Sequence, residues 1–255
     1  MRYNISRFPT KIKKYKRLPI VRNNSTNTTM NKEQRRVKIV EVGPRDGIQN
    51  ESSTNILPSE SKITFVKKLI EAGCQFIECG SFVSPKWVPA MANSSDVLSG
   101  LHQWRDSSVN ESDKVTVFSV LTPNLKGFGN AISAGGGSVD EVAIFGAASE
   151  TFSTKNIGCS IEESLVKFRQ VTDAARGLGI PVRGYVSCVL GCPYEKNVDP
   201  SKVAEVTGKL IEMGCHEVSL GDTIGVGTPY ETIRMINEVK VCFRIFNLFF
   251  SLSDN

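Results

Sequence analysis

Histidine, paired cysteine and long apolar runs are scarce or missing in this sequence. The 255 residues include only two histidines, His102 and His216, and no His-x-His pair, so neighbouring imidazole ligands for a metal are excluded. Seven cysteines occur singly, without a C-x-x-C pair, and an odd number in a chain without secretion features favours reduced thiols. No apolar stretch approaches the ~20 residues that a membrane span needs. We therefore expect a soluble protein without a membrane partner.

Acidic residues are nearly absent from residues 1–36, which hold eleven Lys or Arg and one acid, Glu33. The rest of the chain holds 20 basic and 25 acidic residues, so the net charge of +5 belongs to this segment. The body of the protein therefore offers no excess of basic residues for nucleic acid, and we expect no such partner. The segment is also rich in Ser, Thr and Asn, which is typical of a transit peptide and predicts import into the mitochondrial matrix. A solvated, disordered basic tail is the alternative.

Runs of strand length alternate with helical patterns along residues 37–239. The predicted strands are VKIVEV (37–42), FIEC (76–79), VTVFSVL (115–121), EVAIF (141–145), VRGYVS (182–187) and EVSL (217–220). The predicted helices run from Pro58 to about Gly73, from residues 159–163 to Gly177 or Gly179, from Pro200 to Gly214, and from Pro229 to about Val239. This alternation predicts right-handed crossovers and a parallel sheet, hence an α/β protein.

The parallel sheet could be an open doubly wound sheet or a closed TIM-type (β/α) barrel. No G-x-G-x-x-G follows the first strand, so the dinucleotide-binding open sheet has no support. Polar residues follow strand after strand, as in a barrel whose active face is built from many loops. Six units fill 202 residues, and eight at that rate would need ~270, near the usual size. We predict an incomplete barrel domain at 37–239 with six of eight units, and an atypical apolar tail at 240–255.

The first loop, VGPRDGIQNE (42–51), places an arginine and a carboxylate directly after the first predicted strand. Asp46 supplies a hard oxygen ligand suited to Mg²⁺ or Mn²⁺. Arg45 can stabilise negative charge that develops on an oxygen during a reaction. A structural Arg–Asp surface pair in a Pro-Gly turn explains this motif alone equally well.

Polar residues also follow each of the other predicted strands. In chain order they are Glu78, Ser81 and Ser84, then Thr122 and Asn124, Ser149 and Glu150, Tyr185 and Ser187, and Ser219 and Asp222. If the strands form a barrel, these groups converge on one face. Ordinary loop polarity would have to produce the same coincidence after every strand, so the sequence favours an active site.

From Val37 to Val239, about four-fifths of the chain, the sequence resembles the 3-hydroxy-3-methylglutaryl-CoA lyase family. The matching segments are VKIVEVGPRDGIQNE, SFVSPKWVPAM, LTPNLKGF, EVAIFGAASETF, KNIGCSIEES, VRGYVSCVLGCPYE, PSKVAEVT and CHEVSLGDTIGVGTP. The first and last are shared more loosely by other barrel lyases and condensing enzymes. SFVSPKWVP and GCPYE are closer to the lyases themselves.

The resemblance implies a divalent-metal-dependent cleavage that gives acetyl-CoA and acetoacetate, with Mg²⁺ or Mn²⁺ as cofactor and an acyl-CoA as substrate. It implies that Asp46 binds the metal, that Arg45 binds substrate and stabilises the enolate, and that Glu78 and Asp222 shape the catalytic site. We further predict substrate contacts from four polar residues: Gln49, Asn124, Tyr185 and Ser219. A homodimer is left open.

The sequence departs from the family at the metal. The family's His-x-His ligands, a later Asn and a catalytic Cys in a glycine-rich loop have no counterparts here. We expect His102 and His216 to be surface or packing residues, and Cys192 to be a buried, inert thiol without a catalytic role. Asp46 alone cannot hold an ion that needs about six donors.

Three interpretations follow from this incomplete site. The chain is a lyase whose sequence is C-terminally truncated, by a transcript or gene-structure error that sequencing past Val239 would reveal. Alternatively, it is a condensing synthase, which SFVSPKWVP and GCPYE disfavour, or an inactive fragment that binds a partner. We expect the chain as written to show little lyase activity and weak Mn²⁺ binding.

Overall fold

The computed structural model describes residues 37–51, 56–110, 113, 115–136, 139–243 and 248–252. Residues 1–36, on which the transit-peptide prediction rests, lie outside this part of the chain. Within the described ranges, no helix combines the length and apolar character needed to cross a membrane.

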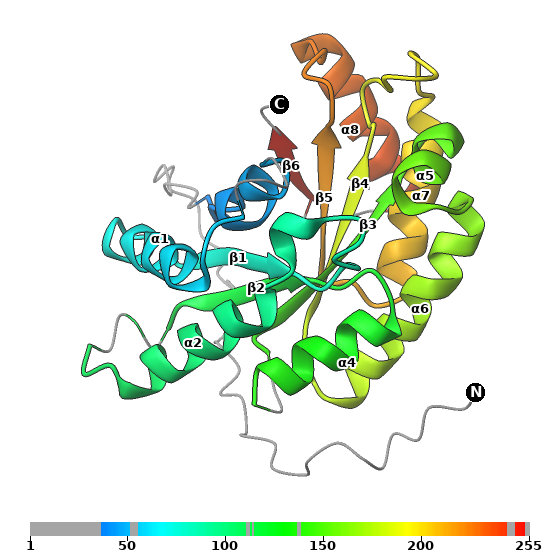
Figure 1. The fold of residues 1–255 in the computed structure, drawn as a ribbon. Helices are drawn as coiled ribbons and strands as arrows, with labels where there is room; N and C mark the ends of the chain where they lie inside the picture. Colours follow the sequence, from blue (N-terminus) through cyan, green and yellow to red (C-terminus); the bar gives the residue numbers. More distant parts are fainter. Residues whose placement is uncertain are drawn as a thin grey trace, which may run out of the picture.

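Six parallel strands form one sheet, in which each strand pairs with the next along the chain. The strands are β1 (Phe76–Ser81), β2 (Val117–Leu121), β3 (Glu141–Ala147), β4 (Val182–Ser187), β5 (Glu217–Asp222) and β6 (Leu248–Leu252). Sequential parallel order with a crossover between neighbours is the arrangement of a (β/α) barrel. The sheet is accordingly an arc of such a barrel, with β1 and β6 as its outer members (Figure 1).

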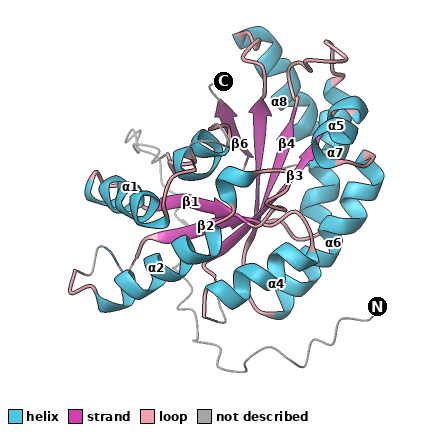
Figure 2. Ribbon diagram, in the orientation of Figure 1, coloured by secondary structure: helices cyan, strands magenta, loops and turns pink. Residues whose placement is uncertain are grey.

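Helices surround the strands on the outside of the arc (Figure 2). They are α1 (Ser59–Glu71), α2 (Ser94–Ser107), α4 (Leu125–Ala134), α5 (Glu150–Ile157), α6 (Ile161–Gly177), α7 (Pro200–Glu212) and α8 (Pro229–Phe243). The predicted helices correspond to α1, α6, α7 and α8, whereas α2, α4 and α5 are additions. The alternation of these helices with the strands confirms the predicted α/β class with an incomplete (β/α) barrel.

The first predicted strand, 37–42, does not form. Of these residues only Glu41 pairs with β1. Its N–H donates to the Phe76 carbonyl at 2.9 Å, and its carbonyl accepts from the Glu78 N–H at 2.8 Å. A π-helical turn, η2 (Gly43–Gly47), follows directly. Val37 and Ile39 are 81% and 73% exposed. Among the described residues, residues 37–42 have β1 on one side and no strand on the other. The β-branched run therefore lacks a second strand that would extend its pairing.

Part of the predicted apolar tail at 240–255 has regular secondary structure. α8 continues to Phe243, and residues 248–252 form β6. This strand pairs in parallel with β5 over five residues, from Val218 opposite Leu248 to Asp222 opposite Leu252. The described part of the apolar run therefore covers the edge of β5, because backbone groups at a sheet edge are satisfied by an added strand.

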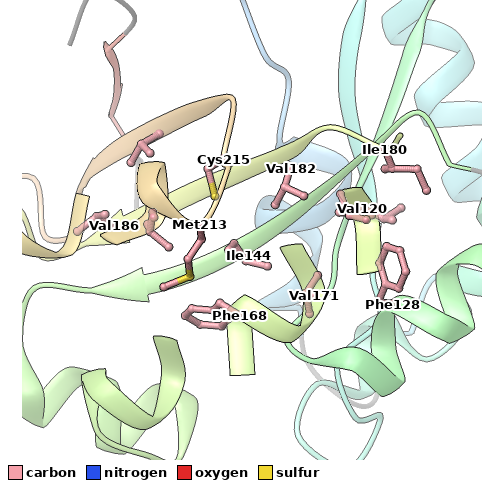
Figure 3. Close-up of a cluster of buried hydrophobic side chains, with 14 of the residues drawn as sticks. Val120, Phe128, Ile144, Phe168, Val171, Ile180, Val182, Val186, Met213 and Cys215 are labelled. Carbon is pink, nitrogen blue, oxygen red and sulfur yellow. The ribbon is translucent and has the colours of Figure 1, made fainter. Parts of the chain in front are cut away.

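The core lies between the sheet and its helices. Apolar strand residues such as Ile144 and Val186 face Phe168 and Val171 of α6, and Val120 lies near Phe128 of α4 (Figure 3). These six side chains are all 0% exposed. This apolar layer holds the strands in place and so fixes the positions of the loops at their carboxyl ends.

Charged residues occupy the opposite, amino-terminal end of β3, β4 and β5. Arg183 is 1% exposed and lies between Glu141 and Glu217, both of which form ion pairs with it. The His216 Nε2 lies 2.8 Å from Glu141, and the Lys38 Nζ lies 2.9 Å from Glu217. His216 therefore has a structural partner at the end predicted for it. Pairing compensates the desolvation of these buried charges.

Candidate active site

The η2 turn presents Arg45 and Asp46 beside the carboxyl half of β1. The Arg45 and Asp46 N–H groups donate to the Val42 carbonyl at 3.0 Å and 2.7 Å, which coils the backbone. The Gly43 N–H donates to the Glu41 carboxylate at 2.7 Å. A Cβ at Gly43 would lie 2.8 Å from the same oxygen, so a larger residue here would displace the Glu41 carboxylate from this hydrogen bond.

Arg45 is buried and bound by two carboxylates. Its Nε donates to Oε1 of Glu78, and its Nη1 donates to Oδ1 of Asp46 at 2.6 Å. Burial would lower the pKa of Arg45, but the negative charges of Glu78 and Asp46 raise it above the usual range. The guanidinium is therefore a permanent positive charge held in one orientation.

Tyr185, on β4, completes the surroundings of Glu78. Its hydroxyl donates to Oε2 of Glu78 at 2.6 Å, and its ring centroid lies 5.7 Å from the Arg45 guanidinium carbon. Burial and the charge of Glu78 raise the pKa of Tyr185 well above its ordinary value, so the phenol remains a donor. Glu78 is 0% exposed, and each of its oxygens accepts one of these two hydrogen bonds.

Asp46 lies at the open side of the network. Its side chain is 33% exposed, and Oδ1 also accepts from the Gln49 Nε2 at 2.7 Å. The structure thus brings together five of the predicted site residues: Arg45, Asp46, Gln49, Glu78 and Tyr185. The alternative of an isolated Arg–Asp surface pair is excluded, since Arg45 is 8% exposed and also contacts Glu78.

Ser219 and Asp222 come from β5. Ser219 is opposite Tyr185 in the register of β4 and β5, so the two side chains project from the same face of the sheet. Asp222 is 2% exposed and accepts from the Gly227 N–H at 2.7 Å and the Val226 N–H at 3.3 Å. These bonds close the loop after β5. The predicted roles of both residues in the reaction stay predictions.

Asn124 acts as the N-cap of α4. Its Oδ1 accepts from the Gly127 N–H at 3.0 Å, which satisfies a free donor of the first helical turn. This bond explains the residue by its local structure. Its predicted contact with substrate is a separate role that remains a prediction.

The described residues do not complete a metal site. No group of three or more His, Cys, Asp or Glu side chains with ligand geometry occurs among them. Asp46 is one carboxylate, and Oδ1 is already engaged by Arg45 and Gln49. Mg²⁺ requires about six oxygen donors, so this part of the chain does not fit the ion on its own.

Neither histidine is a ligand candidate. His216 pairs with Glu141 at the amino end of the strands. The His102 ring stacks on Phe118 at a centroid distance of 6.0 Å, and burial lowers its pKa. Both therefore have structural contacts, as the sequence predicted.

Cys192 is buried, as predicted, but its surroundings differ from those of an inert thiol. Burial raises the pKa of its thiol, yet hydrogen bonds from the Glu195 N–H, Ser149 and the Tyr194 N–H outweigh burial and lower it. Sequence analysis missed this cluster, because its donors come from two separate loops. Ser149 after the fourth predicted strand and the GCPYE motif were its only signals.

The fold and the site together define a (β/α)-barrel protein whose carboxyl-end site is built around a buried guanidinium. Two carboxylates bind this guanidinium, and a tyrosine donates to one of them. The HMGL-like family model matches residues 36–248. The chain belongs to this family.

Individual relatives carry lyase names. The chain is 57% identical over 205 residues to the mitochondrial hydroxymethylglutaryl-CoA lyase of Bos taurus, covering 80% of this chain and 59% of that protein. It is 53% identical over 203 residues to the cytoplasmic 3-hydroxy-3-methylglutaryl-CoA lyase of Homo sapiens, covering 80% and 51%. The crystal structure of the Pseudomonas aeruginosa hydroxymethylglutaryl-CoA lyase matches with a TM-score of 0.75 and 50% identity, covering 84% and 67%. The chain thus spans between half and three-fifths of these two curated relatives.

Proposed function

We propose that this protein is a carbon–carbon lyase that cleaves 3-hydroxy-3-methylglutaryl-CoA into acetyl-CoA and acetoacetate. The observation that carries the proposal is Arg45, buried and held by Glu78 at the carboxyl end of β1. The names of the relatives support the substrate. They disfavour a condensing synthase, in agreement with the SFVSPKWVP and GCPYE segments.

The reaction is a retro-Claisen cleavage. The tertiary hydroxyl of the substrate loses its proton, and the bond between C2 and C3 breaks. C3 becomes the ketone of acetoacetate, while C2 and the thioester carbonyl become an enolate that takes up a proton to give acetyl-CoA. Negative charge therefore moves onto the thioester oxygen, and a fixed cation beside that oxygen lowers the barrier.

Arg45 is suited to stabilise this enolate. Its bonds to Glu78 and Asp46 use two of the five guanidinium N–H donors, so others remain for a substrate oxygen. Glu78 and Tyr185 hold the group before substrate arrives, and this preorganisation avoids a reorganisation cost during the reaction. In this scheme Gln49, Ser219 and Asn124 contact the substrate, and Asp222 shapes the loop beside it.

A divalent ion, Mg²⁺ or Mn²⁺, would acidify the substrate hydroxyl. Asp46 is the carboxylate of this site proposed to contribute to such an ion. Because the described residues fall short of a full ligand set, we assign the removal of the proton to none of them.

A direct test incubates the purified chain with 3-hydroxy-3-methylglutaryl-CoA and Mg²⁺ or Mn²⁺ and quantifies both products by mass spectrometry. We expect equal amounts of acetyl-CoA and acetoacetate, at a turnover well below the ~10 s⁻¹ typical of enzymes. Arg45→Gln should lower the rate by about 10²–10³-fold, as for loss of one donor to a developing oxyanion. Arg169→Gln, on the exposed face of α6, is the matched control.

Two results would contradict the proposal. One is an unchanged product rate in Arg45→Gln. The other is a chain that neither forms products nor binds the thioester in isothermal titration calorimetry. The calorimetric measurement separates substrate binding from turnover.

The incomplete metal set favours one second candidate, an inactive chain that acts by binding a full-length family member. Sedimentation of the chain mixed with such a lyase tests this candidate. A mixed complex without product formation by the chain alone would support it, whereas independent sedimentation would exclude it. Sedimentation of the chain alone also tests the proposed homodimer.

We place the protein in the mitochondrial matrix, on the basic, acid-poor composition of residues 1–36. The relatives include proteins named mitochondrial and cytoplasmic, so their names do not distinguish the compartments. Residues 1–36 fused to a fluorescent protein should accumulate in mitochondria. A diffuse signal would reject this location.

A further inference from the structure

The loop after β4 carries two neighbouring thiols that the proposed lyase reaction does not use. Cys188 and Cys192 are 0% and 1% exposed. They are four positions apart in the same loop, and each thiol influences the pKa of the other. Each also contacts a different neighbouring loop, and these contacts make the two thiols chemically unequal.

Three hydrogen-bonding groups surround the sulfur of Cys192. The backbone N–H groups of Tyr194 and Glu195 lie 3.4 Å from it, and the hydroxyl of Ser149 lies 3.1 Å from it. Backbone N–H groups that converge on one atom stabilise negative charge there. They favour the thiolate, which is the nucleophilic form of cysteine.

Ser149 is also the N-cap of α5, and its oxygen accepts from the Phe152 N–H at 3.1 Å. Its hydroxyl hydrogen is free to turn toward the Cys192 sulfur when that sulfur is a thiolate, and the Glu195 carboxylate is a second acceptor nearby. The cap of α5 therefore also stabilises a thiolate at Cys192.

The loop that contains Cys192 is held rigidly. Cys192 and Lys196 exchange two backbone hydrogen bonds of 2.9 Å each, and Oε1 of Glu195 accepts from the Thr151 N–H at 2.7 Å. The bond between Thr151 and Glu195 ties the loop to α5. The N–H donors consequently stay in place around the sulfur.

Cys188 has the opposite character. Burial raises the pKa of its thiol to about 12, and the adjacent Cys192 and the charge of Glu195 act in the same direction. Its backbone has φ 62°, a conformation that non-glycine residues rarely adopt, and its N–H donates to the Thr223 hydroxyl at 2.7 Å. It therefore remains a neutral thiol beside the thiolate-stabilising site.

We propose that Cys192 and Cys188 form an oxidation site at which a small hydroperoxide converts the thiol pair into an intrachain disulfide. The proposal is independent of the lyase function, since it concerns neither Arg45 nor its partners. Both thiols are buried, so hydrogen peroxide is a suitable oxidant and a bulky disulfide such as oxidised glutathione is excluded.

The chemistry proceeds in two balanced steps. The Cys192 thiolate attacks one peroxide oxygen, the O–O bond breaks, and uptake of a proton gives a sulfenic acid and one water. The Cys188 sulfur then attacks the Cys192 sulfur and displaces the hydroxyl group, which leaves with the Cys188 proton as a second water. Two thiols are oxidised by two electrons in total, and the peroxide is reduced.

Other cysteines lack these surroundings. Burial raises the pKa of Cys215 to about 12, and burial together with the charge of Glu41 raises that of Cys74. Cys74 is more exposed than Cys192, so it separates the effect of thiolate stabilisation from that of exposure. It supplies the matched control.

The test treats the chain with equimolar hydrogen peroxide, blocks free thiols and digests with trypsin. Cleavage after Arg183 and Lys196 releases residues 184–196, which contain both cysteines and no other. We expect this peptide to lose two hydrogen atoms and resist alkylation before the other cysteines react, and oxidised glutathione to leave it unchanged. A peptide that stays reduced while Cys74 is oxidised would overturn the proposal.

Two variants assign the roles. Cys192→Ser should slow peroxide consumption by at least about tenfold, because the nucleophile is lost, whereas Cys74→Ser should not change it. Cys188→Ser should leave Cys192 as a sulfenic acid that dimedone labels. Equal slowing in Cys192→Ser and Cys74→Ser, or no dimedone adduct in Cys188→Ser, would refute the assignment. Circular dichroism verifies that each variant is folded.

Discussion

Glu78 is a completely buried carboxylate, and its environment determines the geometry of the site. An isolated buried charge is costly, but Glu78 has a cation on one oxygen and a phenol on the other. Each partner in turn is oriented by Glu78. Arg45 is therefore positioned by residues that do not need to contact substrate themselves.

The residue-scale prediction concerns Tyr185→Phe. This change removes the hydroxyl that donates to Glu78 at 2.6 Å and leaves a buried charged oxygen with one fewer partner. Urea unfolding should show a loss of about 1–3 kcal/mol in the free energy of unfolding. Tyr230→Phe, at a 74% exposed tyrosine, should have almost no effect. Equal effects of the two changes would mean that the Tyr185–Glu78 bond does not stabilise the fold.

Helices and strands formed where the local sequence pattern was supported by packing or pairing with other elements. α6 begins with a capping box, in which the Ser160 hydroxyl accepts from the Glu163 N–H at 3.1 Å and the Glu163 carboxylate accepts from the Ser160 N–H at 3.0 Å. It then buries seven residues against β3 and its neighbours. Residues 37–42 have strand propensity without the neighbours, and they pair at Glu41 alone.

The element-scale prediction is that Ser160→Ala lowers the free energy of unfolding by about 1 kcal/mol, because the first turn of α6 loses its cap. Thermal unfolding and urea titration both measure this change. Ser95→Ala, at an exposed non-capping position in the first turn of α2, is the control and should be neutral or slightly stabilising. A Ser160→Ala protein as stable as wild type would show that the cap is dispensable.

Across the whole molecule, the amino and carboxyl ends of the strands carry charged residues in different arrangements. At the amino end of the strands, Arg183 forms ion pairs with Glu141 and Glu217. At the carboxyl end, Arg45 keeps donors for a ligand. The apolar layer between sheet and helices joins these two ends, and the proposed substrate site lies at the carboxyl end, as in other barrels.

The molecule-scale prediction concerns acid stability. Burial alone would raise the pKa of Glu141, but the hydrogen bond to His216 and the charge of Arg183 lower it to about 2 from 4.5. The stabilisation from Glu141 is therefore complete above about pH 4.5 and is lost as the pH falls toward about 2. Linkage places this contribution on the order of 3 kcal/mol. Urea unfolding between pH 5 and pH 2 measures it.

Glu141→Gln should flatten this pH dependence, although the variant is less stable at neutral pH. Glu212→Gln, an exposed carboxylate at the end of α7, should keep the wild-type slope. An unchanged slope in Glu141→Gln would assign the acid sensitivity to other carboxylates.

Five site residues were predictable because a barrel gathers the ends of its strands: Arg45, Asp46, Gln49, Glu78 and Tyr185. The hydrogen bonds among these residues were not predictable from the sequence, because the partners of Glu78 lie 33 and 107 positions away in the chain. The donors around Cys192 were missed for the same reason, because Ser149 is 43 positions from it. β6 was missed because a continuous apolar run lacks the alternation that identifies a strand. Its pairing with the edge of β5 is visible only in the tertiary structure.

The amino-acid sequence by itself determined the alternation of strands and helices, the side of the sheet that carries polar residues and the family. These features depend on short-range periodicity and on residue types next to each strand. Only the tertiary structure decided that Glu78 is bonded on both oxygens, that residues 37–42 pair with the sheet at Glu41 alone, and that the two buried thiols of the loop after β4 differ in acidity. Each depends on atoms from distant segments, and hydrogen bonding, burial and charge act through space rather than along the chain.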